Sequence, residues 1–229
     1  MIGILGGMGT QAGLDFCNKL AIINRGKNDQ QYPLFLLYNK SNIPKRPENL
    51  KRYTNVLKSL VLGCQMLQKN NCKFIVIPCN TAHYWYDDLR KKIKIPIISM
   101  PREVFIHTKK NCKKKSRIGI LCTEATLKTG IYNKYFDKNF KLVSPGKSLQ
   151  KKNVNKAIKF VKMGKVKQAE KALRPAVNYL MRIKCKKIIL GCTELPIAIF
   201  AFKSFKKIKQ SKIFLDPNYI LANPAMNKY

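Results

Sequence analysis

Two cysteines in similar settings are the residues best suited to chemistry in this chain. Cys79 follows the apolar run KFIVIP and precedes Asn80 and Thr81, while Cys192 follows KKIILG and precedes Thr193. In both places an expected strand ends at the cysteine and an expected helix begins just after it. The unpaired N–H groups of a helix start lower the pKa of a thiol from about 8.5. The polar neighbours can cap those helices or donate hydrogen bonds to an anion beside each sulfur.

Two thiols on opposite sides of one carbon atom can invert its configuration. A thiolate removes a proton from one face while a thiol delivers a proton to the other, so each sulfur must be poised near the working pH. Because such a carbon acid is weak, hydrogen-bond donors around the substrate must stabilise the developing negative charge. The scheme requires no metal and no cofactor. One strand-end cysteine alone is better explained by packing, but two in matching positions favour acid–base catalysis.

The order of elements around the cysteines occurs twice. The sequence IGIL occurs at 2–5 and again at 118–121, 116 positions later, and the two cysteines are 113 positions apart. We predict strands at 2–5, 33–38, 73–78, 95–99, 117–122, 140–143, 186–191 and 212–215. We predict helices near 10–25, 49–70, 81–92, 101–111, 125–136, 153–163, 165–183 and 194–206, and a short one after Asp216-Pro217.

Short apolar strands that alternate with helices are typical of parallel sheets covered on both faces. We therefore predict an α/β fold of two similar, pseudo-symmetric three-layer lobes, each a mostly parallel sheet flanked by helices. The first lobe is expected to span 1–98 together with the tail 209–229, and the second to span 99–208. Because ligands bind at the carboxyl ends of parallel strands, we expect an active site in the cleft between the lobes.

The composition indicates a globular protein with an unusual charge. Of 229 residues, 45% are hydrophobic, and the formal net charge is +35. A charge this high suggests an anionic partner, but the lysines are spread along the chain without interleaved aromatics, so we do not expect nucleic acid. The N-terminal MIGILGG shows no leader pattern, and no apolar run is long enough for a membrane span. We expect a cytoplasmic protein with its eight cysteines reduced, because neither the N-terminal sequence nor the length suggests a small secreted domain with a disulfide framework.

Four motifs together resemble the aspartate/glutamate racemase family. They are GGMG at 6–9, IPCNTAH at 77–83, GCTELP at 191–196 and DPNYILA at 216–222, and they span nearly the whole chain in order. Within this family the chain is most similar to the aspartate racemases. The resemblance implies a pyridoxal-independent isomerase with two α/β lobes and no cofactor. It assigns Cys79 and Cys192 to the two catalytic positions, and it implies a small acidic amino-acid substrate and a homodimer.

The resemblance also implies roles for other residues. Arg46, in SNIPKRPENL, matches an arginine that binds the side-chain carboxylate of the substrate, and Lys162, in FVKMGK, matches a second carboxylate partner. The segment ILCTEAT implies that Thr123 and Thr126 donate to the α-carboxylate. The remaining expected substrate-binding residues are Met8, Gly9, Asn80, Thr81 and Thr193.

Two ionisable residues stand close to the cysteines in sequence. His83, four residues after Cys79, is expected either to polarise the thiol or to contact the helix cap. Glu194, two residues after Cys192, is expected either to orient that thiol or to serve the first helical turn. We predict no metal site, because a structural zinc site would need a CxxC pair or more than the two histidines present.

Some positions depart from the family pattern and leave alternatives open. Lys45 stands where an acidic residue usually precedes the arginine, and Thr10 stands where a proline usually follows GGMG. Lys45 adds charge at the expected recognition loop and is expected either to shift specificity or to reduce activity. A related two-cysteine isomerase of the maleate or hydantoin type is one alternative. Another is a basic nucleic-acid-binding protein built on a racemase scaffold.

Overall fold

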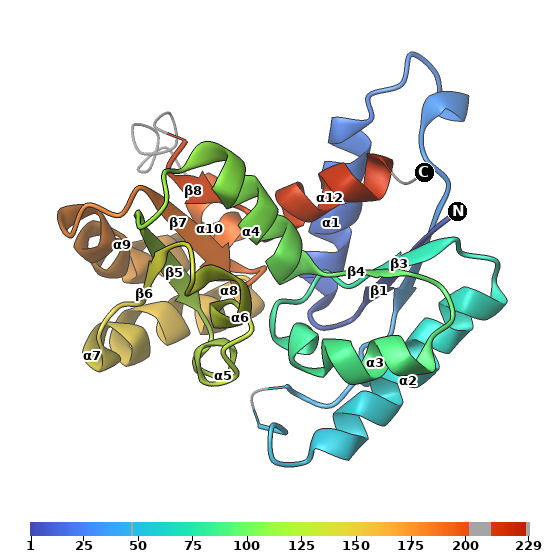
Figure 1. The fold of residues 1–229 in the computed structure, drawn as a ribbon, viewed down its shortest axis with the longest axis horizontal. Helices are drawn as coiled ribbons and strands as arrows, with labels where there is room; N and C mark the ends of the chain where they lie inside the picture. Colours follow the sequence, from blue (N-terminus) through green and yellow to red (C-terminus); the bar gives the residue numbers. More distant parts are fainter. Residues whose placement is uncertain (47, 202–211, 228–229) are drawn as a thin grey trace. The chain divides into compact units, whose positions relative to one another are not determined.

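The computed structural model describes residues 1–46, 48–201 and 212–227, and Figure 1 shows its fold. It divides into two compact units, Met1–Glu103 with Asn218–Tyr229 and Val104–Pro217. Each unit contains one four-stranded sheet, and every pair of neighbouring strands is parallel. The predicted α/β fold with two similar lobes is confirmed.

The two sheets have the same topology. The first has the strand order β2-β1-β3-β4 and the second β6-β5-β7-β8, so the repeat seen in the sequence is also a repeat of structure. The strands are β1 (Ile2–Gly6), β2 (Phe35–Asn39), β3 (Phe74–Val76), β4 (Ile97–Ile98), β5 (Arg117–Cys122), β6 (Lys141–Val143), β7 (Lys187–Gly191) and β8 (Phe214–Leu215). All lie at predicted positions. The two IGIL sequences lie in β1 and β5, and each of these strands pairs with a neighbouring strand on both sides.

The helices of the first unit are α1 (Thr10–Ile23), α2 (Tyr53–Lys69), α3 (Tyr86–Lys92) and the 3₁₀ turns η1 (Asp29–Gln31) and η2 (Thr81–Trp85). Those of the second are α5 (Glu124–Lys128), α6 (Asn133–Phe136), α7 (Lys147–Leu149), the π-helical η3 (Gln150–Asn155), α8 (Lys156–Lys162), α9 (Val166–Arg182) and α10 (Leu195–Phe200). Two further helices, α4 (Met100–Asn111) and α12 (Pro217–Asn227), include the chain positions where one unit gives way to the other.

Three predicted helices differ in detail. The helix predicted at 125–136 is two short helices separated at Gly130, whose φ of +61° is easy for glycine alone. The one predicted at 81–92 begins as a 3₁₀ turn. The one predicted at 194–206 is helical over Leu195–Phe200, and its positions from 202 onward lie outside the described residues.

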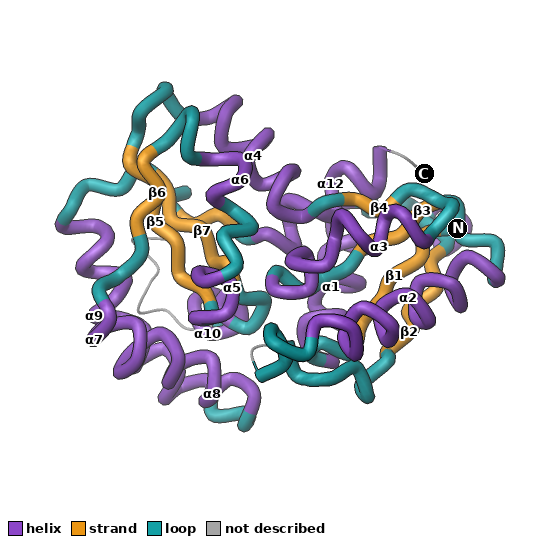
Figure 2. The backbone as a smooth tube through the Cα atoms, turned by 60° about the horizontal axis from the view of Figure 1, so that its bottom comes forward, coloured by secondary structure: helices purple, strands orange, loops and turns teal. Residues whose placement is uncertain are grey.

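Alternating side chains give the first sheet two apolar faces, as parallel strands require. Ile2 and Ile4 of β1 pack in one cluster with Phe16 of α1 and Leu221 of α12. Leu5 of the same strand packs in the opposite cluster, with residues of α2 and α3. Figures 1 and 2 show α1 and α12 along one face of this sheet and α2 and α3 along the other. The first unit is therefore a three-layer structure.

The second sheet is covered in the same way. Leu121 of β5 and the alternate β7 residues Ile188 and Leu190 pack in one cluster with α8, α9 and α10. The opposite face is next to an aromatic cluster in which Phe136 contacts Phe105 and Phe140 edge to face or tilted. Figure 2 shows α4 and α6 together on that side of β5, β6 and β7.

The tail of the chain departs from the predicted domain limits. The prediction assigned all of 209–229 to the first lobe, but β8 pairs with β7 in the sheet of the second unit. The chain returns to the first unit only at Asn218, whose side-chain amide donates hydrogen bonds to Ala12 O and Asp15 Oδ2. Strand pairing thus keeps β8 in the second unit.

Among the helices described, none combines the length and the apolar character that a bilayer crossing needs.

Candidate active site

A glycine-rich turn after β1 holds the Arg46 loop at the carboxyl end of the first sheet. Gly7 has φ +88°, and a Cβ there would lie 2.3 Å from the carbonyl oxygen of Lys40, so only glycine fits. The next residue, Met8, is buried, and its carbonyl oxygen accepts a hydrogen bond of 2.8 Å from Arg46 Nη2. Gly9 precedes α1 in an extended conformation. Three predicted site residues, Met8, Gly9 and Arg46, therefore lie together.

The guanidinium of Arg46 is fixed by backbone carbonyl groups. Its Nη1 donates to Ile43 O at 3.3 Å and to Pro44 O at 3.2 Å, in addition to the bond from Nη2 to Met8 O. Its Nε–H is buried and has no hydrogen-bond partner within the described part of the chain. A guanidinium carries five N–H donors; three of them are used in these bonds, which set its orientation, and the buried Nε–H is among the two that remain for another acceptor.

Cys79 lies three residues beyond the end of β3, at the same edge of the first sheet. It is 6% exposed and packs in one apolar cluster with Met8 and Ile43, so it shares this region with the turn and the Arg46 loop. The residues that follow form the 3₁₀ turn η2, and the Asn80 side chain does not cap it. Asn80 and Thr81 are both buried beside the cysteine. The expected α-helix start is therefore wrong at this position, and of the two roles considered for Asn80, capping is not the one observed.

His83 binds the backbone of Cys79. Its Nε2 accepts a hydrogen bond of 3.0 Å from Met100 N–H, so the ring proton is on Nδ1, which donates to Cys79 O at 2.9 Å. Burial lowers the pKa of His83 to about 4, which keeps the ring neutral near pH 7. Of the two roles expected for His83, the structure favours the contact with the backbone, because both ring nitrogens are already hydrogen-bonded.

Cys192 lies in the equivalent place of the second sheet, one residue beyond β7, but in a different polar setting. Its Sγ–H donates a hydrogen bond of 3.0 Å to Glu194 Oε2, and Thr193 Oγ1 donates to the same oxygen at 3.4 Å. Burial, followed by the charge of Glu194, raises the pKa of the Cys192 thiol well above its ordinary value. The expectation that a helix start lowers this pKa is wrong here, since α10 has only six residues and begins beyond Glu194.

Lys162, near the end of α8, lies close to the same carboxylate. Its Nζ is 3.7 Å from Glu194 Oε1, and its side chain is 53% exposed where that of Glu194 is 6% exposed. The positive charge of Lys162 acts to lower the pKa of Cys192 but does not overcome burial and Glu194. The structure therefore brings Lys162, Thr193 and Cys192 to one carboxylate, that of Glu194.

Thr123 and Thr126 form the cap of α5. Thr123 Oγ1 accepts a hydrogen bond of 3.1 Å from the backbone N–H of Thr126, and the two hydroxyl oxygens are 3.0 Å apart. Cys122 and Gly191 are paired across β5 and β7, so Thr123 and Cys192 are the first residues beyond two neighbouring strands. Both threonines thus lie at the same sheet edge as Cys192, where their observed role is helix capping.

Sequence reasoning missed one buried polar residue beside Cys192. Tyr132 is 1% exposed, and burial raises its pKa well above the ordinary value, with further contributions from Cys122, Asp216 and Cys192. Asp216 belongs to the motif DPNYILA but had no assigned role, and Tyr132 belongs to none of the four family motifs. Only the fold brings Tyr132 within electrostatic reach of Asp216 and Cys192.

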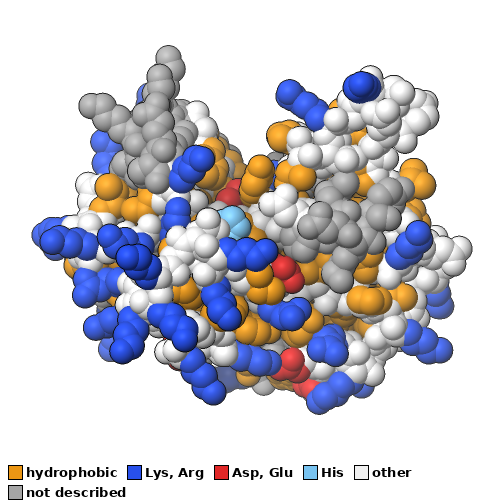
Figure 3. All heavy atoms as spheres, turned by 45° about the horizontal axis from the view of Figure 1, so that its top comes forward, with side chains coloured by type: hydrophobic (Ala, Val, Ile, Leu, Met, Phe, Trp, Pro, Cys, Tyr) orange, Lys and Arg blue, Asp and Glu red, His pale blue; other side chains and the backbone are white. Residues whose placement is uncertain are grey.

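Metal-binding clusters and basic patches would indicate other functions. Among the residues described, no group of three or more His, Cys, Asp or Glu side chains is placed to hold a metal ion. Figure 3 shows Lys and Arg side chains dispersed over the face it draws, with few Asp and Glu among them. This dispersed pattern is unlike the single basic stripe of a typical nucleic-acid-binding surface.

Comparison with known proteins shows similarity along the whole chain. The model of a family described as Asp/Glu/Hydantoin racemase matches residues 5–223. The broad specificity amino-acid racemase RacX of Bacillus subtilis is 28% identical over 236 aligned residues, which cover 100% of this chain and 98% of that protein. The glutamate racemase of Carboxydothermus hydrogenoformans is 26% identical over 185 residues, which cover 74% of this chain but 62% of that protein.

Solved structures agree with this similarity. The structure of an aspartate racemase from Picrophilus torridus superposes with a TM-score of 0.85 at 29% sequence identity, covering 99% of this chain and 93% of that chain. An aspartate racemase homologue from Pyrococcus horikoshii superposes with a TM-score of 0.78 at 22% identity, which supports the fold alone.

Proposed function

Because the chain belongs to the Asp/Glu/hydantoin racemase family, we propose that it is an amino-acid racemase that interconverts L- and D-aspartate. The aspartate racemase of Picrophilus torridus and the racemase RacX are similar to it over almost their full lengths, which supports this activity. Glutamate is the second acidic substrate in the proposal. The reaction is proposed to need no pyridoxal phosphate or other cofactor.

The proposed mechanism is two-base proton transfer at Cα by Cys79 and Cys192. One sulfur, as thiolate, takes the Cα proton from one face, and the other, as thiol, gives a proton to the opposite face, so the carbon inverts and the two sulfurs exchange protonation states. The matching positions of the cysteines, beyond β3 and β7 of two sheets with one topology, support this pairing. The hydrogen bond from Cys192 to Glu194 and its raised pKa support Cys192 as the proton donor of the resting enzyme, with Cys79 as the base.

Arg46 is proposed to bind the side-chain carboxylate of the substrate. Its buried Nε–H has no partner in the described residues, and a carboxylate is a strong acceptor for a guanidinium N–H. Lys162 is proposed to bind a substrate carboxylate as well, in addition to its contact with Glu194. Backbone N–H groups of Met8 and Gly9 and the side chains of Asn80, Thr81, Thr123, Thr126 and Thr193 complete the proposed substrate site.

The single observation that carries the proposal is the pair of cysteines in equivalent places of a racemase-family fold. The test is incubation of enantiopure L-aspartate with the protein in deuterium oxide, followed by polarimetry and by proton NMR of the Cα position. We expect the optical rotation to decay to zero and Cα to become deuterated at a comparable rate. Unchanged rotation with no deuterium at Cα, for aspartate and glutamate alike, would show the proposal to be wrong.

A second candidate is a related isomerase acting on maleate or on hydantoins, because the family description also names hydantoin. Assays of maleate and of a chiral hydantoin beside both acidic amino acids distinguish these activities. Nucleic-acid binding is the remaining alternative, and its support is the net charge of +35. Salt-dependent retention of DNA at physiological ionic strength would favour it.

We also propose a cytoplasmic homodimer. Leu34 and Phe35 are 66% and 40% exposed at the start of β2, the edge strand of the first sheet. Leu14 and Ile22 of α1 are 48% and 51% exposed. Exposed apolar side chains on an edge strand favour association with a second copy. Light scattering coupled to size exclusion measures the mass directly, and a monomer at micromolar concentration would contradict a homodimer.

A further inference from the structure

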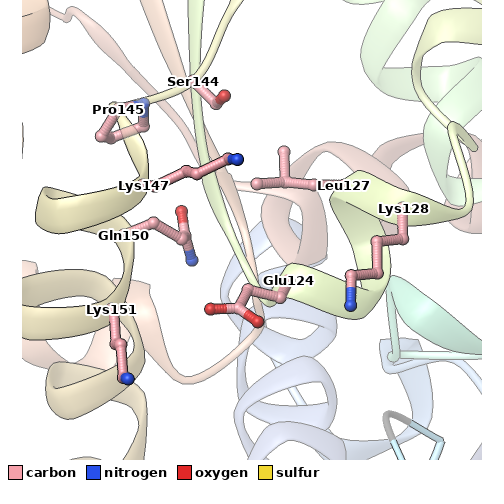
Figure 4. A pocket seen from close by; sticks show the side chains of 8 residues that line it. All are labelled: Glu124, Leu127, Lys128, Ser144, Pro145, Lys147, Gln150 and Lys151. Carbon is pink, nitrogen blue, oxygen red and sulfur yellow. The ribbon is translucent and has the colours of Figure 1, made fainter.

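A pocket of about 410 Å³ lies in the second unit, at the carboxyl ends of β5 and β6. Figure 4 shows its two sides: Glu124, Leu127 and Lys128 come from α5, while Lys147, Gln150 and Lys151 come from α7 and η3. Ser144 and Pro145, in the loop after β6, complete the lining. None of these residues belongs to the proposed acid–base or substrate-binding set.

A chain of hydrogen bonds fixes the amide of Gln150 in this pocket. Asn155 Nδ2 donates to the Glu124 carboxylate at 2.8 Å, so Asn155 Oδ1 faces the other way and accepts from Gln150 Nε2 at 2.9 Å. The same Nε2 donates to Cys122 O at 2.8 Å. Both of these acceptors bind the nitrogen end of the amide. The nitrogen and the oxygen of the Gln150 amide therefore cannot exchange places without loss of both hydrogen bonds.

The other end of this amide is an unsatisfied acceptor. Gln150 is 3% exposed, and its Oε1 has no hydrogen-bond partner within the described residues. In Figure 4 this oxygen is on the Lys147 side of the amide, and the nitrogen is on the Glu124 side. A buried carbonyl without a donor is rare, and in a native structure it indicates a missing partner. Gln150 lines the pocket, so that partner is expected to be a donor on a ligand.

The local backbone is also unusual. Gln150–Asn155 forms a π-helical segment, in which residues five apart lie side by side, and this is what brings Asn155 to Gln150. Short π-helical segments are rare and are found most often at functional sites. The segment adopts this geometry where it builds the pocket wall.

The charge of the pocket favours an anion. Lys128, Lys147 and Lys151 line it, against Glu124 as the one carboxylate in its lining, and none of the three lysines forms an ion pair in the part of the chain described. A phosphate group offers three strong acceptor oxygens to such a set of ammonium groups. Leu127 and Pro145 provide apolar surface for a short carbon chain.

We propose that this pocket is a second binding site, separate from the racemase site, for a small organic phosphate that carries a hydroxyl group. The phosphate binds among Lys128, Lys147 and Lys151. The hydroxyl donates a hydrogen bond to Gln150 Oε1, and the carbon chain lies against Leu127 and Pro145. The proposal does not depend on the racemase activity, because none of the lining residues belongs to the proposed acid–base or substrate-binding set.

Calorimetric titration of the full chain with glycerol 3-phosphate tests the site. We expect a Kd of about 1 mM or tighter. Methyl phosphate has the same charged group but no carbon-bound hydroxyl, and we expect it to bind about tenfold more weakly. Inorganic phosphate distinguishes a general phosphate site from one for an organic phosphate, and equal or tighter binding of inorganic phosphate would overturn the organic-phosphate assignment.

Matched lysine variants locate the binding. The double variant Lys147→Gln, Lys151→Gln is expected to weaken glycerol 3-phosphate binding at least about tenfold, because each charge-assisted contact is lost. The double variant Lys138→Gln, Lys141→Gln changes the net charge equally on another surface of this unit and is expected to leave binding unchanged. Equal weakening by both double variants, or competition by aspartate for the same site, would overturn the proposal, as would the absence of binding at about 10 mM ligand.

Discussion

Cys79 and Cys192 occupy equivalent positions in two sheets of the same topology, yet the groups around them differ. Beside Cys79 the ionisable neighbour is His83, which is buried, neutral and hydrogen-bonded to backbone at both ring nitrogens. Beside Cys192 it is Glu194, which accepts a hydrogen bond from the sulfur itself. The repeated fold thus supplies two similar places for a thiol, but a neutral histidine stands beside one and a carboxylate beside the other.

This difference has a chemical consequence for a two-base racemase. Both thiols cannot act as bases at the same moment, so the resting enzyme needs one of them protonated. Burial, followed by the carboxylate of Glu194, raises the pKa of Cys192 and so keeps its proton, whereas His83 carries no charge near pH 7 to act on Cys79. In the proposed function, the asymmetry therefore selects which cysteine begins the reaction as the acid.

The largest expected effect follows from removing either sulfur. Cys79→Ala and Cys192→Ala should each lower kcat for aspartate racemisation by about 10³-fold, since each removes one acid–base group. Cys112→Ala, which changes a partly exposed cysteine outside the proposed site, should keep full activity. Polarimetry on all three purified variants measures this. Activity retained by Cys79→Ala or by Cys192→Ala would contradict the two-base mechanism.

The next largest effect concerns the neighbour of Cys79. His83→Ala should lower the free energy of unfolding by about 3 kcal/mol, because it leaves a cavity and an unpaired carbonyl and N–H. His107, the other histidine, is only partly buried, and His107→Ala should cost less than about 1 kcal/mol. Urea unfolding monitored by circular dichroism compares the two variants. A small effect of His83→Ala would mean that the two backbone contacts contribute little.

His83 also predicts a pH dependence of stability. Its pKa is lowered from 6.5 to about 4 in the folded protein, so its contribution to stability is complete above the unfolded pKa and is lost as the pH falls toward the folded pKa. Between about pH 7 and about pH 5 this loss amounts to roughly 2 kcal/mol. The variant His83→Ala should lack this component. An unchanged pH dependence in the variant would show that other groups cause it.

The neighbour of Cys192 should affect the pH profile rather than the fold. Glu194→Gln removes a negative charge but keeps an acceptor for the sulfur, so the pKa of Cys192 should fall relative to the wild type. The proton donor is then lost at lower pH, and the alkaline limb of the kcat profile should move to lower pH. At neutral pH we expect kcat to fall by no more than about tenfold. A limb that moves to higher pH would contradict the role of Glu194.

Replacing Lys162 should give the smallest effect, and it should shift the alkaline limb of the kcat profile in the opposite direction from Glu194→Gln. Its charge lowers the pKa of Cys192, so Lys162→Met should raise that pKa and move the alkaline limb to higher pH. The effect on kcat is expected to be below about threefold, because the side chain is half exposed and solvent screens its charge, while loss of the proposed contact with the substrate carboxylate raises KM. Lys159→Met, an exposed lysine of the same helix, is the matched control. Equal shifts in both variants would mean that the net charge of the protein, and not the position of Lys162, sets the pKa of Cys192.

The strands and the repeated order were predictable because they depend on local patterns. Apolar runs such as those of β1 and β7 indicate buried parallel strands, and the IGIL sequences together with the similarly spaced cysteines indicate the repeat. The strand β8 was predicted, but its pairing with β7 was not, because an apolar run indicates a strand without indicating the sheet to which it belongs. The break of the helix at Gly130 was likewise missed, although a glycine inside an expected helix is the signal for it.

In the candidate site as well, the sequence identified the residues but not the contacts that the fold creates between them. Motifs identified both cysteines, Arg46 and Glu194, but the sequence could not show that Arg46 binds Met8 O or that His83 binds Cys79 O. The sign of the Cys192 pKa shift was predicted wrongly because burial and a nearby carboxylate outweigh a helix start. The Gln150 pocket carried no motif at all, since it depends on a π-helical turn that brings Asn155 to Gln150.

The most direct test of the central claim follows deuterium exchange into each enantiomer by the single-cysteine variants. If the two sulfurs serve opposite faces of Cα, Cys192→Ala should exchange the Cα proton of only one aspartate enantiomer with solvent, and Cys79→Ala only that of the other. NMR of L- and D-aspartate incubated separately with each variant gives the four rates. Exchange of the same enantiomer by both variants, or of both enantiomers by one variant, would contradict the account.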